Sequence, residues 1–176
     1  MKHPIEILEQ YWKFSEFKPQ QEAIIEAVLA NEDCIALLPT GGGKSICFQI
    51  PGLIKDGICI VVSPLIALMQ DQVNTLKEKG IKAMALTSGL SYVDIDRMLD
   101  NCIYGSYKFL YLSPERLQQD LVQERIKQMN VNLIAVDEAH CISQWGHDFR
   151  PAYRDIKILR TLHPNVNVIG LTASAT

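Results

Sequence analysis

The chain alternates short apolar runs with longer amphipathic segments, and this order restricts its fold more than any other feature. Each run is short enough for a strand that is buried within a sheet. We expect strands at 34–38, 58–62, 83–86, 109–112, 133–136 and 166–171. Strands that alternate with helices form parallel sheets with helices on both faces. The sequence therefore predicts an α/β fold with a mostly parallel sheet.

The segments between the strands show helical periodicity. It is clearest at 65–79, where one stripe is apolar and Gly80 ends the pattern. The stripe consists of Leu65, Leu68, Met69, Val73 and Leu76. Further helices are expected at 21–30, 46–54, 91–102 and from Pro151 onward. A chain of 176 residues with 48% hydrophobic content can bury the core of a single domain without disulfides or metals.

A glycine-rich stretch, Leu-Pro-Thr-Gly-Gly-Gly-Lys-Ser at 38–45, separates a strand at 33–38, interpreted as buried, from the helix that begins at Ile46. Glycines let successive N–H groups converge on a phosphate, and the helix N-terminus adds positive potential. We expect Lys44 to contact the β- and γ-phosphates of ATP and Ser45 to hold Mg²⁺. The expected nucleotide-binding residues are Pro39, Thr40, Gly41, Gly42, Gly43, Lys44 and Ser45. Leu38 replaces the usual first glycine, and the alternative is a glycine-rich turn with an exposed lysine.

Two carboxylates, Asp137 and Glu138, emerge together after the apolar run 131–136. Open parallel sheets bind ligands at the carboxyl ends of their strands. Asp137 is placed to hold Mg²⁺, and Glu138 to orient and deprotonate the water that attacks the γ-phosphate. The alternative is a pair of acids that caps a helix N-terminus. Together with the glycine-rich stretch, the pair favours a hydrolase over a protein that only binds nucleotide.

These motifs carry a family resemblance. Asp-Glu-Ala-His at 137–140, with the stretch at 41–45, resembles the motor of superfamily 2 helicases, and Cys-Ile-Ser-Gln-Trp-Gly-His-Asp-Phe-Arg-Pro at 141–151 resembles the aromatic-rich loop of the RecQ family. Further similarity lies at 17–21, the adenine-reading motif, and at 61–73, 111–117 and 171–176, the motifs Ia, Ib and III. The resemblance covers essentially the whole chain. It implies a RecA-like P-loop NTPase fold, ATP and Mg²⁺ as cofactors, and the catalytic residues Lys44, Asp137, Glu138 and His140.

The resemblance also implies how adenine is recognised. Gln21 is expected to hydrogen-bond both edges of the base, because a carboxamide offers a donor and an acceptor together. Phe14 is expected to stack on the base, and Lys18 stands where arginine is more usual, which predicts looser contact. The alternative for Gln21 is a surface position on a helix.

DNA contacts must be local, because the net charge is −3, from 17 basic and 20 acidic residues. Ser63 and Ser113 each follow a predicted strand and precede a proline, a pattern typical of a helix N-cap and first helical position. The resemblance implies that these elements line the track of a single DNA strand. We expect both serines to be ordinary helix caps as well, and the DNA role rests on the resemblance alone.

The aromatic-rich segment is the second expected DNA contact. Trp145, His147, Phe149 and Arg150 are suitable platforms for unstacked bases. The resemblance implies a switch in which bound single-stranded DNA rearranges this segment and signals to the hydrolytic site, and it assigns Thr172 and Ser174 to the same coupling. The alternative for the aromatic rings is anchoring in the core.

The resemblance implies that residues 1–176 are the first RecA-like lobe of a 3′-to-5′ DNA helicase in repair or recombination. The expected partners are single-stranded and duplex DNA and a second lobe. That lobe, with zinc and winged-helix modules, lies outside the sequence, so we expect little hydrolysis by this lobe alone. Scattered cysteines and the lack of an apolar leader favour a cytoplasmic protein, nucleoid-associated in bacteria or nuclear in eukaryotes. The alternatives are an RNA-helicase-like lobe and a non-hydrolysing nucleotide- or DNA-binding module.

Overall fold

The computed structural model of the chain describes residues 2–39, 43–138 and 150–173. Its strands are β1 (Cys34–Leu38), β2 (Ile58–Val62), β3 (Ala83–Leu86), β4 (Phe109–Leu112), β5 (Val131–Asp137) and β6 (Val168–Ala173). Its helices are α1 (Pro4–Ile7), η1 (Leu8–Trp12), α2 (Gln21–Leu29), α3 (Ile46–Ile54), α4 (Ile66–Glu78), α5 (Tyr92–Tyr104), α6 (Pro114–Leu117), α7 (Asp120–Gln128) and α9 (Arg150–Leu162).

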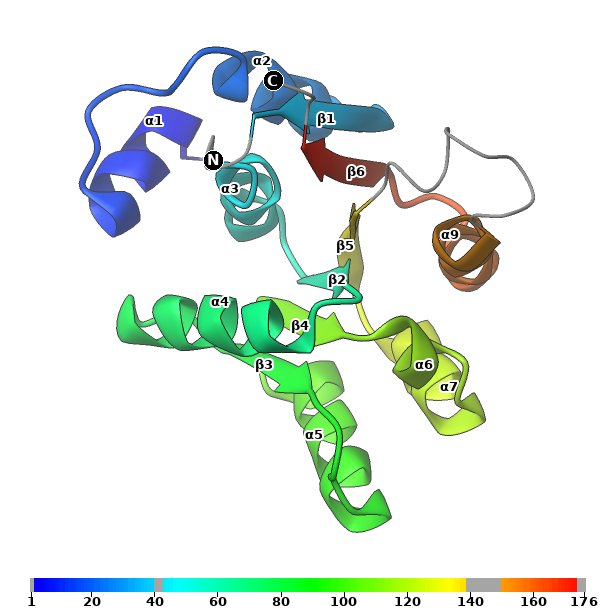
Figure 1. Cartoon of the computed structure of the whole chain (residues 1–176). Coiled ribbons are helices and arrows are strands. Elements are labelled where there is room, and N and C mark those ends of the chain that lie inside the picture. Colours follow the sequence, from blue (N-terminus) through cyan, green and yellow to red (C-terminus); the bar gives the residue numbers. More distant parts are fainter. Residues whose placement is uncertain (1, 40–42, 139–149, 174–176) are drawn as a thin grey trace.

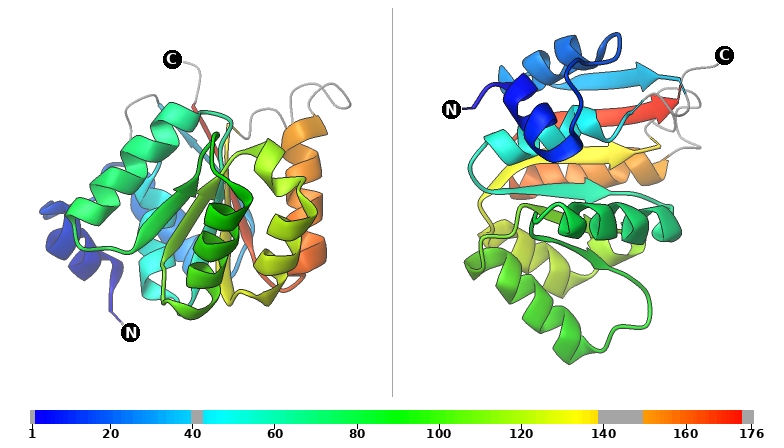
Figure 2. Two further views of the ribbon diagram at one scale, coloured as in Figure 1. Left: turned by 90° about the horizontal axis from the view of Figure 1, so that it is seen from below. Right: turned by 90° about the vertical axis from the view of Figure 1, so that its left-hand side faces the viewer.

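The described strands form one sheet in the order β1-β6-β5-β2-β4-β3, and all the recorded pairs are parallel. Helices cover both faces of the sheet (Figures 1 and 2). The α2, α3 and α4 helices pack on one face, and α5, α6, α7 and α9 on the other. The predicted α/β fold is confirmed.

The two faces are covered by separate apolar clusters, because successive strand residues point to opposite sides of a sheet. Val61 and Tyr111 pack beneath α3 and α4, whereas Val62 and Leu112 pack against the helices of the other face. The N-terminal segment α1–η1 packs on α3 through a smaller cluster around Leu8 and Ile50. Helix α3, which follows the glycine-rich stretch, is therefore held between the sheet and the N-terminal segment.

The strand at 33–38 was expected to be buried, and this prediction is wrong. β1 lies at the edge of the sheet, where Ala36 and Leu38 are buried but Ile35 and Leu37 are 53% and 56% exposed. An apolar run does not reveal which strand ends a sheet, because strand order is a property of the tertiary pairing.

The ends of β5 and β6 also differ from the expected bounds of 133–136 and 166–171. An asparagine lies beside each start, and both side chains are buried. Asn132 donates to the carbonyl oxygens of Gly52 and Lys55, and Asn167 donates to those of Val28 and Glu32. These side-chain amides donate hydrogen bonds to carbonyl groups at the amino edge of the sheet. Both asparagines can therefore lie at the strand starts and remain buried.

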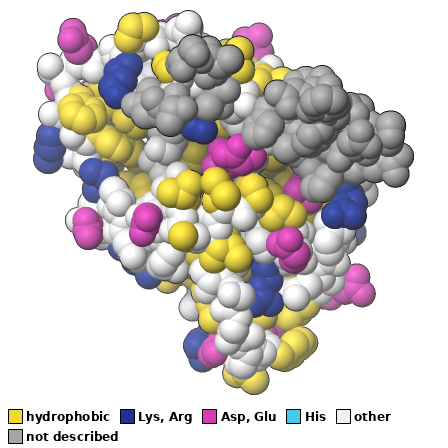
Figure 3. Space-filling model, viewed as in Figure 1, with side chains coloured by type: hydrophobic (Ala, Val, Ile, Leu, Met, Phe, Trp, Pro, Cys, Tyr) yellow, Lys and Arg dark blue, Asp and Glu magenta, His cyan; other side chains and the backbone are white. Residues whose placement is uncertain are grey.

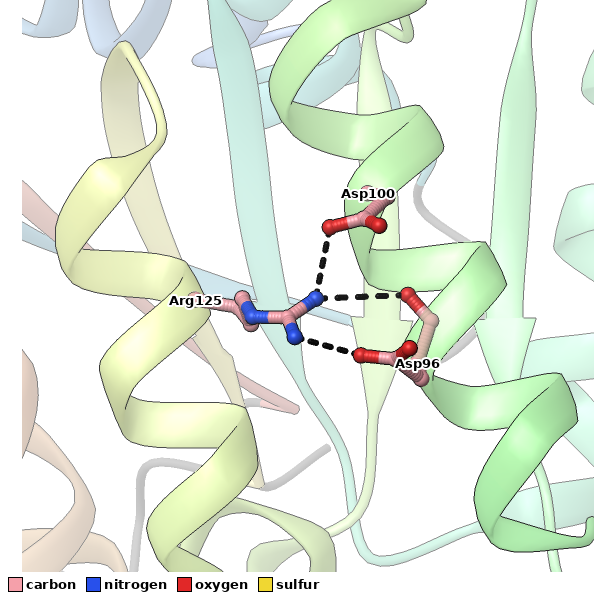
Figure 4. Close-up of polar contacts among 3 residues, drawn as sticks. All are labelled: Asp96, Asp100 and Arg125. Atoms are coloured by element: carbon pink, nitrogen blue, oxygen red, sulfur yellow. Dashed lines mark hydrogen bonds and ion pairs between the residues drawn. The ribbon is translucent and has the colours of Figure 1, made fainter.

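An arginine joins two helices on the α5 side of the sheet (Figure 4). Arg125 of α7 donates to the carboxylates of Asp96 and Asp100 on α5, and to the backbone oxygen of Asp96. The contact fixes the crossing of α5 over α7 at a position where both helices also bury apolar side chains.

In the part of the chain that the structure describes, no helix is both long and apolar enough to span a bilayer.

Candidate nucleotide-binding site

The candidate site lies where β1, β5 and β6 end side by side. Leu37 is paired with Thr172, and Asp137 with Leu171, so the carboxyl ends of these strands share one edge of the sheet. Pro39 follows β1 at this edge and is exposed. Parallel α/β sheets bind their ligands at such an edge.

After β1, the described part of the chain resumes at Gly43, which is followed by α3. Gly43 has a φ of 76°, a left-handed conformation that glycine adopts without steric penalty. Lys44 and Ser45 follow, and Ser45 directly precedes the first residue of α3. Thr40, Gly41 and Gly42 lie outside the described residues. The described part of the stretch thus places a lysine and a hydroxyl at a helix N-terminus.

Lys44 faces the acidic residue of the neighbouring strand. Its Nζ atom lies 3.9 Å from Oδ1 of Asp137, and the two side chains are 25% and 17% exposed. The backbone N–H of Glu138 donates to the same carboxylate oxygen at 2.9 Å. Glu138 itself has a φ of 60°, which is uncommon for a residue with a side chain and is found preferentially at functional sites. His140 lies outside the described residues.

A pocket of about 380 Å³ opens between these groups. Its lining includes Gly43, Lys44, Ser45, Ser63, Tyr111 and Asp137. Leu68, which is 47% exposed, forms part of its rim. Figure 3 shows hydrophobic side chains gathered beside acidic ones near the centre of this face. Among the described residues, the pocket therefore combines a positive group, Lys44, and a negative group, Asp137, with an apolar border.

Gln21 connects the N-terminal motif to the glycine-rich stretch. Its Oε1 atom accepts a hydrogen bond from the N–H of Lys18, and its Nε2 atom donates to the carbonyl of Gly43 at 3.1 Å. Gln21 is only 2% exposed, so the alternative of a surface position is wrong. Phe14 is 53% exposed and Lys18 is exposed, which leaves both side chains accessible to a ligand.

The two serines expected to line a DNA track behave differently. Ser113 caps α6, because its Oγ atom accepts from the N–H of Arg116. Ser63 does not cap α4, so this prediction is wrong. Its Oγ atom accepts from the N–H of Leu65, whose φ and ψ of −102° and 88° are not helical, and α4 begins only at Ile66. Both serines are buried at the carboxyl edge.

The remaining residues predicted to contact DNA lie partly inside and partly outside the described part of the chain. Thr172 lies in β6 and is buried. Arg150 is the first residue of α9, and its side chain lies outside the description. Trp145, His147, Phe149 and Ser174 lie outside the described residues.

The sequence did not reveal a buried polar contact that crosses the pocket wall. Gln49 of α3 donates to the hydroxyl of Tyr111 on β4, and that hydroxyl donates to Gln72 of α4. The available signal was a glutamine within the apolar run of α3 and a tyrosine within the apolar run of β4. Asp155 of α9 is a second residue that was missed, because a buried carboxylate on an amphipathic helix resembles an ordinary polar position.

Comparison with known proteins shows what the chain is similar to. Residues 18–176 match the family model described as DEAD/DEAH box helicase. The chain is 49% identical over 170 residues to the probable ATP-dependent DNA helicase RecS of Bacillus subtilis strain 168, covering 96% of this chain and 34% of that protein. It is 46% identical over 172 residues to ATP-dependent DNA helicase RecQ of the same organism, covering 97% and 29%. The chain thus spans about a third of these relatives.

Solved structures show the same architecture. The DNA-bound structure of the DUF1998 helicase MrfA superimposes with a TM-score of 0.73 at 17% identity, over 99% of this chain and 26% of that one. A hypothetical ATP-dependent RNA helicase from Sulfolobus tokodaii gives 0.70 at 22% identity, over 100% and 51%. At this identity the likeness concerns the fold alone.

Proposed function

Because the chain belongs to the DEAD/DEAH box helicase family and resembles RecQ helicases throughout, we propose that it is the first motor lobe of a RecQ-like DNA helicase. In this proposal the lobe binds Mg²⁺-ATP and, together with a second lobe, couples hydrolysis to 3′-to-5′ movement along single-stranded DNA and separation of the duplex. The compartment that holds the chromosome is the corresponding location.

One observation carries the proposal, namely the 3.9 Å separation of Lys44 Nζ and Asp137 Oδ1 at the mouth of a pocket. A lysine and a carboxylate held together at a helix N-terminus suit a ligand that is both anionic and metal-bound. The ammonium group binds phosphate oxygens, while the carboxylate and the hydroxyl of Ser45 are hard oxygen ligands. The pocket residues therefore fit Mg²⁺-ATP.

Each residue then has a defined task. Lys44 neutralises charge on the β- and γ-phosphates, and the N-terminus of α3 contributes backbone donors. Ser45 and Asp137 are the residues that would hold Mg²⁺, which supplies charge neutralisation on the phosphates when bound. Glu138 follows Asp137 directly, in a backbone conformation that turns the chain at the end of β5. We assign Glu138 the task of orienting the attacking water and accepting its proton.

The base side of the site is built from the N-terminal motif. Gln21 Nε2 donates to the Gly43 carbonyl at 3.1 Å, and this contact supports a base site beside the proposed phosphate-binding stretch. We propose that Phe14, Lys18 and Gln21 surround the base, with Gln21 exchanging some of its present contacts for those to adenine. The high identity to DNA helicases supports this function over an RNA-helicase-like lobe.

The test is Mg²⁺-dependent binding of a labelled, non-hydrolysable ATP analogue to the wild-type chain and to Lys44→Ala. Loss of a charge-assisted contact is worth about 1.5–3 kcal/mol, so affinity should fall about ten- to hundredfold. Lys127→Ala, which removes an exposed lysine of α7, is the matched control and should bind as the wild type does. Equal binding by Lys44→Ala and the wild type would refute the proposed function.

A further inference from the structure

A buried chain of hydrogen bonds joins three elements around the candidate nucleotide pocket. Nε2 of Gln49 donates to the Tyr111 hydroxyl at 2.9 Å, and that hydroxyl donates to Oε1 of Gln72 at 2.7 Å. Gln49 lies in α3, Tyr111 in β4 and Gln72 in α4. Gln49 and Tyr111 are 5% and 1% exposed, so water does not replace these contacts.

The polar atoms lie within an apolar layer. The Tyr111 ring packs against Phe48, with centroids 6.3 Å apart, and both belong to the cluster beneath α3 and α4. A phenylalanine and a leucine would fill the same space without polar groups. A buried polar group is costly unless its hydrogen bonds are made. The three side chains therefore stabilise the structure only when both hydrogen bonds of the Tyr111 hydroxyl are formed. The contact therefore specifies how α3 and α4 sit on β4.

One end of this contact is tied to the phosphate-binding residues. The backbone N–H of Gln49 donates to the carbonyl of Ser45 at 2.9 Å. Tyr111 and Gln72 line the same pocket as Lys44 and Asp137. Burial raises the pKa of Tyr111 and outweighs the lowering by the hydrogen bond from Gln49, so the hydroxyl remains a protonated donor. A displacement of Ser45 or α3 on nucleotide binding would reach Tyr111 through one residue.

The rest of the network adjoins the elements that are proposed to bind DNA. The residue after Tyr111, Leu112, accepts a hydrogen bond from the N–H of Ser63 at 3.1 Å, and Ser113 follows it to cap α6. Gln72 is a residue of α4, the helix that follows Ser63. Tyr111 thus belongs to the strand that leads to Ser113, and its hydroxyl contacts the helix that follows Ser63.

We propose that Tyr111 is a positioning residue that couples nucleotide binding at Lys44–Ser45 to DNA binding at Ser63 and Ser113, through its hydrogen bonds to Gln49 and Gln72. The inference rests on the proposed function. It gives a role to three residues to which the proposed function assigns no contact with a phosphate or a base. In thermodynamic terms, the network makes each ligand's affinity depend on the presence of the other.

The experiment measures the dissociation constant of a fluorescent single-stranded oligothymidylate with and without a saturating, non-hydrolysable Mg²⁺-ATP analogue. The ratio of the two constants is the linkage. We expect a linkage of about fivefold or more in the wild-type chain. Tyr111→Phe should reduce it to less than about twofold, and Gln72→Met should do the same. Because Gln72 is only half-buried, Gln72→Met keeps the test valid if Tyr111→Phe does not fold.

A purely structural role gives a different result. It would weaken both ligands together and leave their ratio unchanged, whereas the proposal predicts an altered ratio. The double variant should equal the single ones, because both changes break one network. Tyr107→Phe is the matched control, since it removes a hydroxyl just before β4 at the opposite edge of the sheet, and its linkage should be that of the wild type.

Two outcomes overturn the inference while the proposed function stands. They are a wild-type linkage in both variants, and a ratio near one in a wild-type chain that binds both ligands. Failure of the wild-type chain to bind the nucleotide analogue would instead refute the proposed function itself. The two failures are therefore distinguishable in one set of titrations.

Discussion

Nε2 of Gln21 donates to the carbonyl of Gly43 at 3.1 Å, and a Cβ atom at residue 43 would lie only 2.4 Å from that nitrogen. The glycine is thus required for two reasons. One is its φ of 76°, and the other is the approach of the Gln21 carboxamide. The same contact links Gln21 of the proposed base site to Gly43 of the proposed phosphate site.

Gly43→Ala should therefore affect ligand binding beyond its effect on the backbone. A left-handed residue with a side chain costs about 1–2 kcal/mol, and the new methyl group must also displace Gln21. We expect reduced stability together with an affinity for an ATP analogue that is about tenfold lower, as for the loss of one or two hydrogen bonds. Fluorescence titration and thermal unfolding measure the two effects.

Gly80→Ala separates the two causes. Gly80 has a φ of 82°, and no atom lies within 4 Å of its would-be Cβ, so this variant pays only the backbone penalty. It should lose stability but bind nucleotide as the wild type does. If Gly43→Ala also kept its nucleotide affinity, the Gln21 contact would have no role in binding.

Asp137→Asn should remove the effect of Mg²⁺ on nucleotide binding. The substitution keeps the shape of the side chain and its acceptor oxygen but removes the charge that faces Lys44 at 3.9 Å. The gain in affinity on adding Mg²⁺ should fall by about tenfold or more, whereas Mg²⁺-free binding should not weaken, because a negative charge beside the phosphates is lost. Titrations with Mg²⁺ and with a chelator measure both. Asp120→Asn, at an exposed position of α7, is the control and should behave as the wild type. An unchanged Mg²⁺ effect in Asp137→Asn would exclude Asp137 as a ligand of Mg²⁺.

Much of the fold follows from local sequence. β1 to β4 begin and end where their apolar runs do, so their predicted bounds are those of the structure. The approach of Lys44 to Asp137 also follows from sequence, because Asp137 ends one strand of a parallel sheet and Lys44 follows another. Motif spacing was sufficient for this part of the site.

The differences arise where a side chain bonds to a distant part of the chain. Asn132 and Asn167 interrupt apolar runs, yet each is buried because it satisfies carbonyl groups of other elements. Ser63 precedes a proline as an N-cap does, but α4 starts later. The contact between Gln49, Tyr111 and Gln72 joins one strand and two helices, and no spacing along the chain indicates it.

Arg125→Met should lower the midpoint of thermal unfolding by a few degrees at low salt. Arg125 contacts two carboxylates and one backbone oxygen of α5, so one substitution leaves several acceptors without their donor. Part of the cluster is exposed, and salt screens such interactions, so the difference from the wild type should shrink as salt is added. Arg97→Met is the control, because Arg97 and Asp94 form an exposed pair within α5. Equal midpoints for the two variants would show that the link between α5 and α7 contributes nothing.

Asp155 gives the chain a predicted pH dependence. The side chain is 1% exposed, and its Oδ1 atom has no hydrogen-bond partner among the residues that the structure describes. Burial raises the pKa of Asp155 to about 7, the positive charge of Arg154 opposes this rise, and the negative charge of Glu115 on α6 adds to it. The folded chain therefore keeps a proton that the unfolded chain releases near its ordinary pKa of 3.8. Stability should fall as the pH rises from about 4 to about 7, and this loss should level off above the folded pKa.

Asp155→Asn removes the titrating group while keeping its shape, so the variant should lose this slope. Its thermal midpoint should be close to that of the wild type near pH 4 and exceed it by several degrees near pH 8, because only the wild type carries a buried charge at the higher pH. Asp71→Asn changes an exposed carboxylate of α4 and should follow the wild-type curve at both pH values. Parallel curves for Asp155→Asn and the wild type would mean that Asp155 is already ionised in the folded chain at low pH. In that case the buried carboxylate must gain stabilisation from a hydrogen-bond donor.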